Sequence, residues 1–344
     1  MSRGRTILLT GASGFIGTHL AERLVANGDE VRALHRREEP PKALLSLRER
    51  YGEGLRLYRA ELGDQRRIAE ALEDVEAVVH TAALAFDWGS MDSFVQTNYQ
   101  ATVNLLHASR EAGVKVFLYM SSAVVQGFGP HVDSTEEGPY YPLKYPYPIT
   151  KKMAEDYVLS KNEPGFRVTA IRPCNVYGPG DRTSTYAMYE AILDGVFGYI
   201  GTGEALTCPI YIDDLCAGTL AALDAPRTAG QALLLTDGSK VSWKEYCRVM
   251  YAAVGSKKKP LSLPTPLAAL SARIMCLGAK LIGAGAPPPL TSYRVEQASQ
   301  DYHFSNARAR SLIGFSPRVF YEEGLHRTAQ AFLQERAGNG DKRP

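Results

Sequence analysis

An α/β fold with a doubly wound parallel sheet, interwoven with a smaller C-terminal region, is the architecture that this sequence predicts. Short apolar runs alternate with amphipathic helical stretches from residue 6 to residue 172, which is the pattern of βαβ units. After residue 175 the alternation loosens. We therefore expect a first domain at residues 1–175, a second region at 176–336 that is partly interwoven with it, and a disordered polar tail at 337–344.

The first element is a buried strand at Ile7–Leu9, and three glycines at positions 11, 14 and 17 follow it directly. A helix then begins, with Ile16, Leu20 and Leu24 on one face. Glycines between a strand and a helix form a phosphate cradle, because the backbone can approach closely and the helix N-terminus offers free N–H groups. The spacing GxxGxxG is one residue longer at its front than GxGxxG. A purely structural turn is the alternative at this point.

The composition limits the kinds of function. A hydrophobic content of 45% allows a large core, and a net charge of +2 gives no sign of a nucleic-acid partner. The five cysteines are scattered, with no CxxC motif and no Cys/His cluster, which favours a reducing compartment and argues against zinc or a disulfide framework. A core strand that begins near residue 6 leaves no room for a signal peptide. We therefore expect a cytoplasmic protein without a metal.

The second predicted strand, Glu30–Leu34, ends at His35, Arg36 and Arg37. In dinucleotide-binding folds, an acidic residue at this place binds the 2′-hydroxyl of the adenosine ribose, whereas an arginine accommodates a 2′-phosphate. The two arginines favour NADP(H) over NAD(H). The alternative is that both are solvated loop residues and that the cofactor is NAD.

Polar residues lie in the predicted helix before the fifth strand and at the end of that strand. Phe94–Ala112 is predicted as one long helix with Asn98 facing the core, where its amide needs hydrogen-bond partners. The fifth strand ends at Ser121 and Ser122, and open parallel sheets bind ligands beyond the carboxyl ends of their strands. The third, fourth and fifth strands are predicted at Leu55–Tyr58, Ala77–His80 and Val116–Met120.

A tyrosine and a lysine follow an irregular stretch at residues 127–147 that we expect to cover the substrate. Tyr147 enters a helix whose first turn contains Pro148, and Lys151 lies one turn further on, so both side chains point the same way. An ammonium group near a phenol lowers the pKa of the phenol towards the working pH. Among the tyrosines of this stretch, only Tyr147 combines a lysine four residues later with a helix start.

The second region contains the most apolar helix, predicted at residues 266–283. It carries Arg273 and Lys280, and it is too short and too charged to span a bilayer. We expect it to cover an apolar substrate pocket or to pack as core, with contact to a membrane surface as the less favoured alternative. Its apolar stripe consists of Leu267, Leu270, Ile274, Leu277 and Leu281. Further strands are predicted at Val168–Arg172, Ile210–Asp214 and Gln231–Thr236, and helices at Leu215–Leu223 and Trp243–Val254.

Taken together, these residues resemble the extended branch of the short-chain dehydrogenase/reductase superfamily over nearly the whole chain. The resemblance implies a Rossmann-type fold and hydride transfer between a carbinol carbon and a nicotinamide. It also implies that Tyr147 is the general acid/base, that Lys151 binds the nicotinamide ribose, and that Ser122 bonds the substrate oxygen. The matching segments are Gly11-Ala12-Ser13-Gly14-Phe15-Ile16-Gly17, His80-Thr81-Ala82-Ala83, Asn98, Ser121-Ser122-Ala123, Tyr147-x-x-x-Lys151 and Arg172-Pro173-x-Asn175-Val176-Tyr177-Gly178.

The resemblance further implies a homodimer formed through the helices that carry Asn98 and Lys151. The position that contacts adenine, usually an aspartate in the superfamily, is Glu61 here. Asn98 is expected to complete the catalytic set of Ser122, Tyr147 and Lys151. The implied cofactor contacts are Gly11, Ser13, Gly14, Phe15, Ile16, Gly17, Arg36, Glu61, Leu62, Thr81, Ala82, Ala83, Tyr147, Lys151, Pro173, Asn175 and Val176.

Three functions fit the resemblance to different degrees. The favoured one is a 3β-hydroxysteroid dehydrogenase-like enzyme or long-chain ketone reductase, acting on a small lipophilic alcohol or ketone. Asn175 also fits a nucleotide-sugar epimerase or dehydratase with tightly bound NAD. However, residues 205–209 carry no positive charge for a diphosphate, and Ala123-Val124 supply no acid pair for a dehydratase. A cofactor-binding protein without turnover would lack part of the catalytic set, which is complete here.

Overall fold

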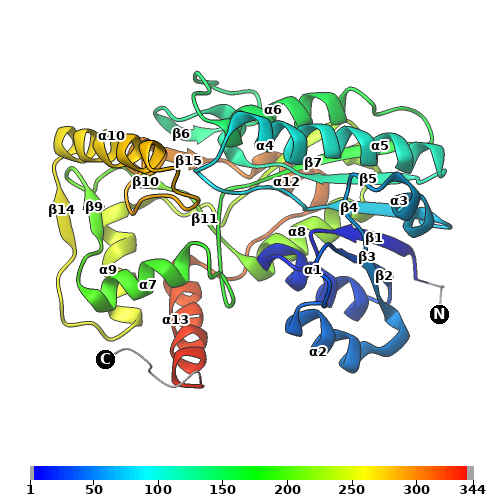
Figure 1. The fold of residues 1–344 in the computed structure, drawn as a ribbon, viewed down its shortest axis with the longest axis horizontal. Helices are drawn as coiled ribbons and strands as arrows, with labels where there is room; N and C mark the ends of the chain where they lie inside the picture. Colours follow the sequence, from blue (N-terminus) through cyan, green and yellow to red (C-terminus); the bar gives the residue numbers. More distant parts are fainter. Residues whose placement is uncertain (1–3, 339–344) are drawn as a thin grey trace.

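The structure, a computed structural model, describes residues 4–338 and is built around one seven-stranded parallel sheet (Figure 1). Its strand order is β12-β7-β5-β4-β1-β2-β3, and all neighbouring strands run parallel. The predicted doubly wound α/β fold is therefore confirmed. The strands are β1 (Thr6–Thr10), β2 (Glu30–His35), β3 (Leu55–Arg59), β4 (Ala77–His80), β5 (Val116–Met120), β7 (Arg167–Pro173) and β12 (Gln231–Leu235).

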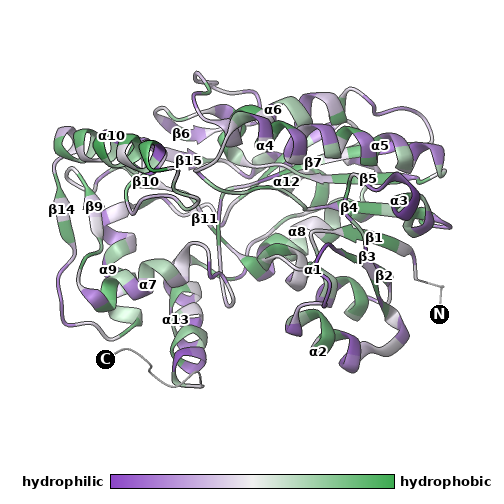
Figure 2. Cartoon of the chain, in the orientation of Figure 1, coloured by the Kyte–Doolittle hydropathy of each residue, from purple (hydrophilic) through white to green (hydrophobic). Residues whose placement is uncertain are grey.

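Helices cover both faces of the sheet, so its strands are buried on both sides. In β1, Leu8 joins the core on one face, whereas Ile7 and Leu9 join the core on the other, which explains the continuous apolar run. Figure 2 shows much of the central sheet in green. One face is covered by α3 (Gln65–Leu72), α5 (Ala101–Glu111) and α6 (Pro146–Leu159), and the other by α1 (Phe15–Ala26), α2 (Lys42–Tyr51) and α8 (Ile212–Asp224).

The second region lies at the carboxyl side of the sheet and is interwoven with it, because its strand β12 forms an edge of the sheet next to β7. It contains α7 (Thr185–Asp194), α9 (Trp243–Ala253), α10 (Thr265–Leu281), α11 (Ser292–Ser299), α12 (Ala307–Ile313) and α13 (Tyr321–Gly338). Short pairs of strands connect distant parts of the chain: β6 (His131–Ser134) with β15 (Tyr302–Phe304), β8 (Asn175–Tyr177) with β11 (Pro209–Tyr211), β9 (Gly198–Ile200) with β14 (Leu261–Leu263), and β10 (Leu206–Thr207) with β13 (Val241–Ser242).

Several predicted elements differ in detail. The helix expected at 94–112 begins earlier, as α4 (Met91–Phe94), and passes through a π-helical turn at Val95–Gln100 before α5. The stretch expected to be irregular contains β6, whose partner β15 lies far along the chain. Helix α8 begins three residues earlier than predicted, at Ile212. The expected tail begins inside α13, which extends to Gly338, and residues 339–344 lie outside the described residues.

Candidate active site

The glycine-rich turn after β1 forms a narrow backbone cradle at the start of α1. Gly11 has a φ of +69°, and a Cβ atom there would lie 2.6 Å from the Ala82 nitrogen. A Cβ atom on Gly17 would lie 2.1 Å from the Gly11 carbonyl oxygen. Helix α1 has no side-chain cap and no acidic residue in its first turn, so its first N–H groups are free to bind an anion. The residues therefore fit a dinucleotide pyrophosphate.

The predicted cofactor residues gather at one edge of the sheet, because each group follows the carboxyl end of a parallel strand. Arg36 and Glu61 follow β2 and β3, and both side chains are exposed. The backbone hydrogen bond from Ala60 to His35, of 3.0 Å, holds these two strand ends together. The other predicted contacts at this edge are Ser13, Phe15, Ile16, Leu62, Thr81, Ala82, Ala83, Pro173, Asn175 and Val176.

The end of β4 is connected to β1 and to the helix of Asn98 by a chain of hydrogen bonds. The Thr102 hydroxyl donates to the Asn98 carbonyl oxygen (2.8 Å), so it accepts from Nε2 of His80 (2.9 Å). Nδ1 of His80 then accepts from the Thr10 hydroxyl (2.6 Å), which itself accepts from the Ala82 N–H. The network therefore fixes the neutral Nε2–H tautomer of His80. It also holds the segment after β4 beside the glycine turn.

Burial and the nearby charge of Lys151 lower the pKa of His80 to about 3. The unfolded chain takes up a proton near the ordinary value of 6.5, so the stability that neutral His80 supplies is present above that pH and is lost as the pH falls towards 3. We expect the wild-type protein to lose about 1.4 kcal/mol per pH unit across this window, relative to a His80→Gln variant. Urea unfolding at several pH values measures the difference, and parallel curves for the two proteins would contradict the assignment.

Asn98 lies in the π-helical turn and is 1% exposed. Its amide binds both backbone groups of Leu84, accepting from the N–H at 2.7 Å and donating to the carbonyl at 3.0 Å. It also donates to the Thr150 hydroxyl of α6 (3.3 Å). The predicted inward orientation is thus confirmed. Asn98 joins the loop after β4 to the helix that carries Tyr147 and Lys151, and any part in catalysis stays a prediction.

Ser122, Tyr147 and Lys151 come together beyond the carboxyl end of β5. Ser122 begins a short 3-10 turn, and its hydroxyl lies close enough to the phenol of Tyr147 to lower the pKa of that phenol. Lys151 is 2% exposed and donates from Nζ to the carbonyl oxygen of Met120, the last residue of β5, at 2.5 Å. The predicted three-residue set is therefore assembled at the edge of the sheet where ligands of such folds bind.

The predicted effect of Lys151 on Tyr147 is wrong in this structure. Burial raises the pKa of Tyr147 to about 12, and the nearby Ser122 hydroxyl opposes this only in part. Burial also lowers the pKa of Lys151 to about 7, against the attraction of Glu155. The physical reason is that the Lys151 ammonium is directed at the Met120 carbonyl and lies 4.4 Å from the centre of the Tyr119 ring. At neutral pH, Tyr147 therefore carries its proton.

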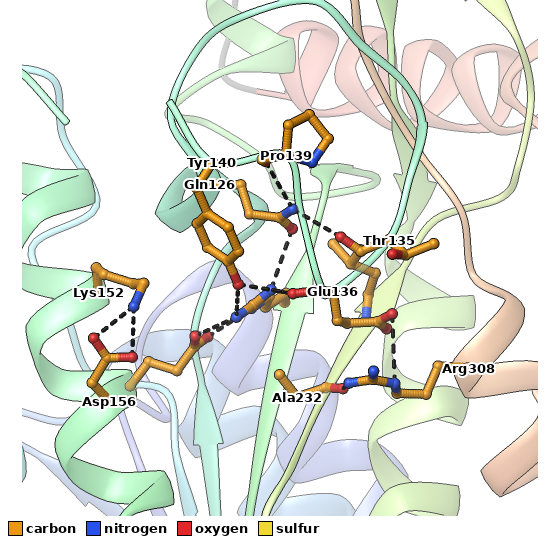
Figure 3. A network of polar contacts seen from close by, with 12 residues as sticks. Gln126, Thr135, Glu136, Pro139, Tyr140, Lys152, Asp156, Ala232 and Arg308 are labelled. Atoms are coloured by element: carbon orange, nitrogen blue, oxygen red, sulfur yellow. Dashed lines mark hydrogen bonds and ion pairs between the residues drawn. The ribbon is translucent and has the colours of Figure 1, made fainter. Parts of the chain in front are cut away.

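A buried ion pair, which was not predicted from the sequence, holds α6, the helix of Tyr147 and Lys151, against the sheet. Glu155 of α6, which is fully buried, binds Arg172 of β7 through both carboxylate oxygens, at 2.7 and 3.0 Å. Arg172 also donates to the side chain of Gln126 and to the Tyr140 hydroxyl (Figure 3). Burial opposes the charge of Arg172, but its contacts with Glu155 raise its pKa overall. The sequence feature that could have indicated this ion pair is an arginine at the end of a predicted strand together with a glutamate within a predicted helix.

An apolar wall of mostly aromatic side chains packs against Tyr147. Tyr147 packs against a buried cluster that includes Phe128, Tyr293 and Tyr302. A cavity of about 780 Å³ lies beside this cluster, lined among others by Trp88, Tyr145 and Tyr293. The charges that line it are largely paired, since Asp87 binds Arg294 (2.7 Å) and Lys144 binds Glu296 (2.5 Å). The hydroxyls of Ser122 and Tyr147 thus lie next to a buried, mostly aromatic cluster, and Tyr145 and Tyr293 connect this cluster to the cavity.

The amide of Asn175 has its partners within the protein. Its nitrogen donates to the Thr207 hydroxyl (2.9 Å), and its oxygen accepts from Gln297 (3.1 Å). Both partners are uncharged. The neighbouring segment at 205–209 brings no basic side chain to this place, so the structure shows no charged clamp there for a diphosphate.

The fold and the site together define a nicotinamide-dependent enzyme of the extended short-chain dehydrogenase/reductase type. The chain belongs to the NAD dependent epimerase/dehydratase family, which it matches over residues 7–234. It is 31% identical over 333 residues to the 2-alkyl-3-oxoalkanoate reductase of Stenotrophomonas maltophilia (strain K279a), a match that covers 93% of this chain and 97% of that protein.

Two further matches are to a related protein sequence and to a solved structure. The chain is 29% identical to a 3 beta-hydroxysteroid dehydrogenase/Delta 5→4-isomerase of Mycobacterium tuberculosis (strain CDC 1551 / Oshkosh), with 93% of this chain and 88% of that protein covered. The crystal structure of UDP-glucuronic acid 4-epimerase from Bacillus cereus, in complex with UDP-glucuronic acid and NAD, superposes with a TM-score of 0.76. That match covers 96% of this chain and 99% of the other, at 23% identity, and therefore shows the fold alone.

Proposed function

We propose that this protein is an NAD(P)-dependent oxidoreductase that interconverts a secondary alcohol and a ketone on a lipophilic substrate. The observation that carries the proposal is the position of Tyr147. The Ser122 hydroxyl lies near its phenol, and its ring packs against an uncharged, mostly aromatic cluster. A proton donor next to an apolar cluster suits a substrate carbonyl group whose substituents are apolar.

The chain's own residues account for the proton transfer. Tyr147 holds its proton at neutral pH, because burial raises its pKa to about 12. In the reductive direction it donates this proton to the carbonyl oxygen as the C–H bond forms at the carbonyl carbon. Ser122 binds the same oxygen, and in the oxidative direction Tyr147 takes the proton back. When bound, the nicotinamide cofactor supplies or accepts the hydride.

The surroundings of the site support a ketone over a nucleotide sugar. A diphosphate needs charged partners, and Asn175 and its neighbours offer uncharged groups only. The two relatives compared above are named for a 3-oxoalkanoate and a steroid, and both names describe oxygen on a lipophilic skeleton. The aromatic wall beside Tyr147 suits such a skeleton.

The test is a substrate panel. The purified protein is given NADPH or NADH with a long-chain 3-oxoalkanoate, a 3-oxosteroid or UDP-glucose, and the loss of reduced-cofactor absorbance and the products are followed. We expect turnover with at least one of the lipophilic ketones. Epimerisation of the sugar nucleotide without added reductant, together with no ketone reduction, would overturn the proposal in favour of an epimerase.

We also propose that NADP(H) is preferred, with Arg36 on the 2′-phosphate. Arg36 is exposed directly after β2, and His35 occupies the place where an acid would exclude a phosphate. Arg36→Ala is expected to weaken NADPH binding about tenfold and to leave NADH binding within about twofold. Isothermal titration with both nucleotides measures the two affinities. Equal losses of affinity for both nucleotides, or tighter NADH binding by the wild type, would mean that Arg36 is a solvated surface residue and does not bind the 2′-phosphate.

A further inference from the structure

Helix α10 exposes its most apolar side to the surroundings. The alanines at positions 268, 272 and 279 face the protein, whereas the large side chains are between 50% and 81% exposed. Figure 2 shows α10 as a mostly green helix at one end of the molecule. The expectation that this helix packs as core is therefore wrong for these side chains, whereas Cys276 and Lys280 of the same helix do line the cavity beside the site. The exposed residues are Leu267, Leu270, Ile274, Leu277, Leu281 and Ile282.

This exposure differs from the scattered hydrophobic residues of an ordinary surface. The stripe repeats every three or four residues, so its members form one continuous ridge along the helix. Single exposed apolar side chains need no explanation, but a continuous apolar ridge marks an interaction surface. Small residues on the inner side let α10 pack closely while its large residues remain outside.

The charge around this ridge is positive. Residues 246–295 contain no aspartate or glutamate, although Lys+Arg and Asp+Glu are nearly balanced in the whole chain, at 39 and 37. Arg273 and Lys280 are exposed on α10 itself, and three consecutive lysines at 257–259 are exposed just before β14. Leu261 in β14 is also exposed, at the same end of the molecule (Figure 1). The acidic side chains near α10, Asp87 and Glu296, form ion pairs with Arg294 and Lys144. An apolar ridge flanked by exposed basic side chains is complementary to a negatively charged lipid surface.

The same charges disfavour a second copy of this chain as the partner. An interface with two-fold symmetry would place the α10 ridges of both copies together, and with them Arg273 and Lys280 of each. No acidic residue in 246–295 could balance these charges. Insertion across the bilayer is not an option for α10 either, since no helix in residues 4–338 is long and apolar enough to span one.

We propose that α10 is a docking helix, which lies in the interface of an anionic lipid bilayer with its apolar ridge among the acyl chains. The basic side chains remain at the level of the lipid headgroups, as long cationic side chains do at such interfaces. The helix also borders the cavity through Cys276 and Lys280, so docking places the cavity against the bilayer.

Vesicle co-sedimentation tests the docking surface without recourse to enzyme activity. The full-length protein is mixed with phosphatidylcholine vesicles that contain roughly one quarter phosphatidylglycerol, and with vesicles of phosphatidylcholine alone. We expect binding to the anionic vesicles that weakens with added salt. Ile274→Ser/Leu277→Ser is expected to reduce the partition coefficient at least about tenfold, because both side chains are exposed in the free protein and would be buried in the bilayer.

The matched control is Leu45→Ser/Phe320→Ser, which removes one exposed hydrophobic side chain in α2 and one directly before α13, outside α10, and is expected to keep vesicle binding. Unchanged thermal unfolding of both variants shows that they fold. The proposal is overturned by equal binding of the two variants, by equal binding to neutral vesicles, or by no vesicle binding of the wild type. A molecular mass that falls on Ile274→Ser/Leu277→Ser without lipid would show instead that the ridge joins two copies of the chain.

Discussion

Replacing Tyr147 with phenylalanine is expected to lower turnover by about 10²–10⁴-fold and to leave nucleotide binding intact. The variant keeps the ring that packs against the buried aromatic cluster, so the apolar wall and the fold remain. It loses the hydroxyl that lies near Ser122, and with it the proton that a carbonyl oxygen must receive. The rate of ketone reduction at saturating cofactor measures the first effect, and nucleotide titration measures the second.

Tyr141→Phe is the matched control, because it removes a tyrosine hydroxyl from the same segment at a distance from the catalytic set. That hydroxyl reaches only the Pro130 carbonyl, at 3.5 Å, so the variant is expected to turn over normally. Turnover that survives in Tyr147→Phe would show that another group is the acid. Loss of nucleotide binding in Tyr147→Phe would show that the substitution acts through the structure of the site.

The sheet and the glycine turn could be predicted because their signals are local. In β1, a run of apolar residues buried on both faces leads into three glycines, of which Gly11 and Gly17 have no room for a Cβ atom, and both features are visible in the eleven residues from Ile7 to Gly17. The position of Asn98 followed from helical periodicity, which the π-helical turn leaves intact on the inner side. The functional roles of these residues remain predictions of the resemblance.

The missed features depend on contacts between distant segments. The pairing of β6 with β15 joins residues 131–134 to residues 302–304, and no local sequence pattern predicts this pairing. The apolar stripe of α10 was visible in the sequence, but its direction was not, because alanines occupy another face at helical spacing and pack inward instead. Likewise, the spacing of Tyr147 and Lys151 places them on one side of a helix without revealing the Met120 carbonyl that binds the lysine.

The ion pair between α6 and β7 leads to the largest expected effect on stability. Glu155→Ala should lower the free energy of unfolding by about 3–5 kcal/mol, because it leaves the Arg172 guanidinium buried without its carboxylate. Urea unfolding measures the change. A double variant with methionine at both positions should be more stable than Glu155→Ala, since it buries no unpaired charge.

Asp156→Ala provides the control on the same helix. Asp156 forms an ion pair with Lys152 at 2.6 Å, four residues away, and its side chain is 59% exposed (Figure 3). Solvent screens this pair, so its loss should cost about 0.5 kcal/mol or less. Similar costs for Glu155→Ala and Asp156→Ala would mean that water reaches Arg172 and that the pair does not hold α6 to β7. A large difference would show that the buried ion pair fixes the helix carrying Tyr147 and Lys151 to the sheet, because removal of the carboxylate leaves the buried Arg172 without a partner.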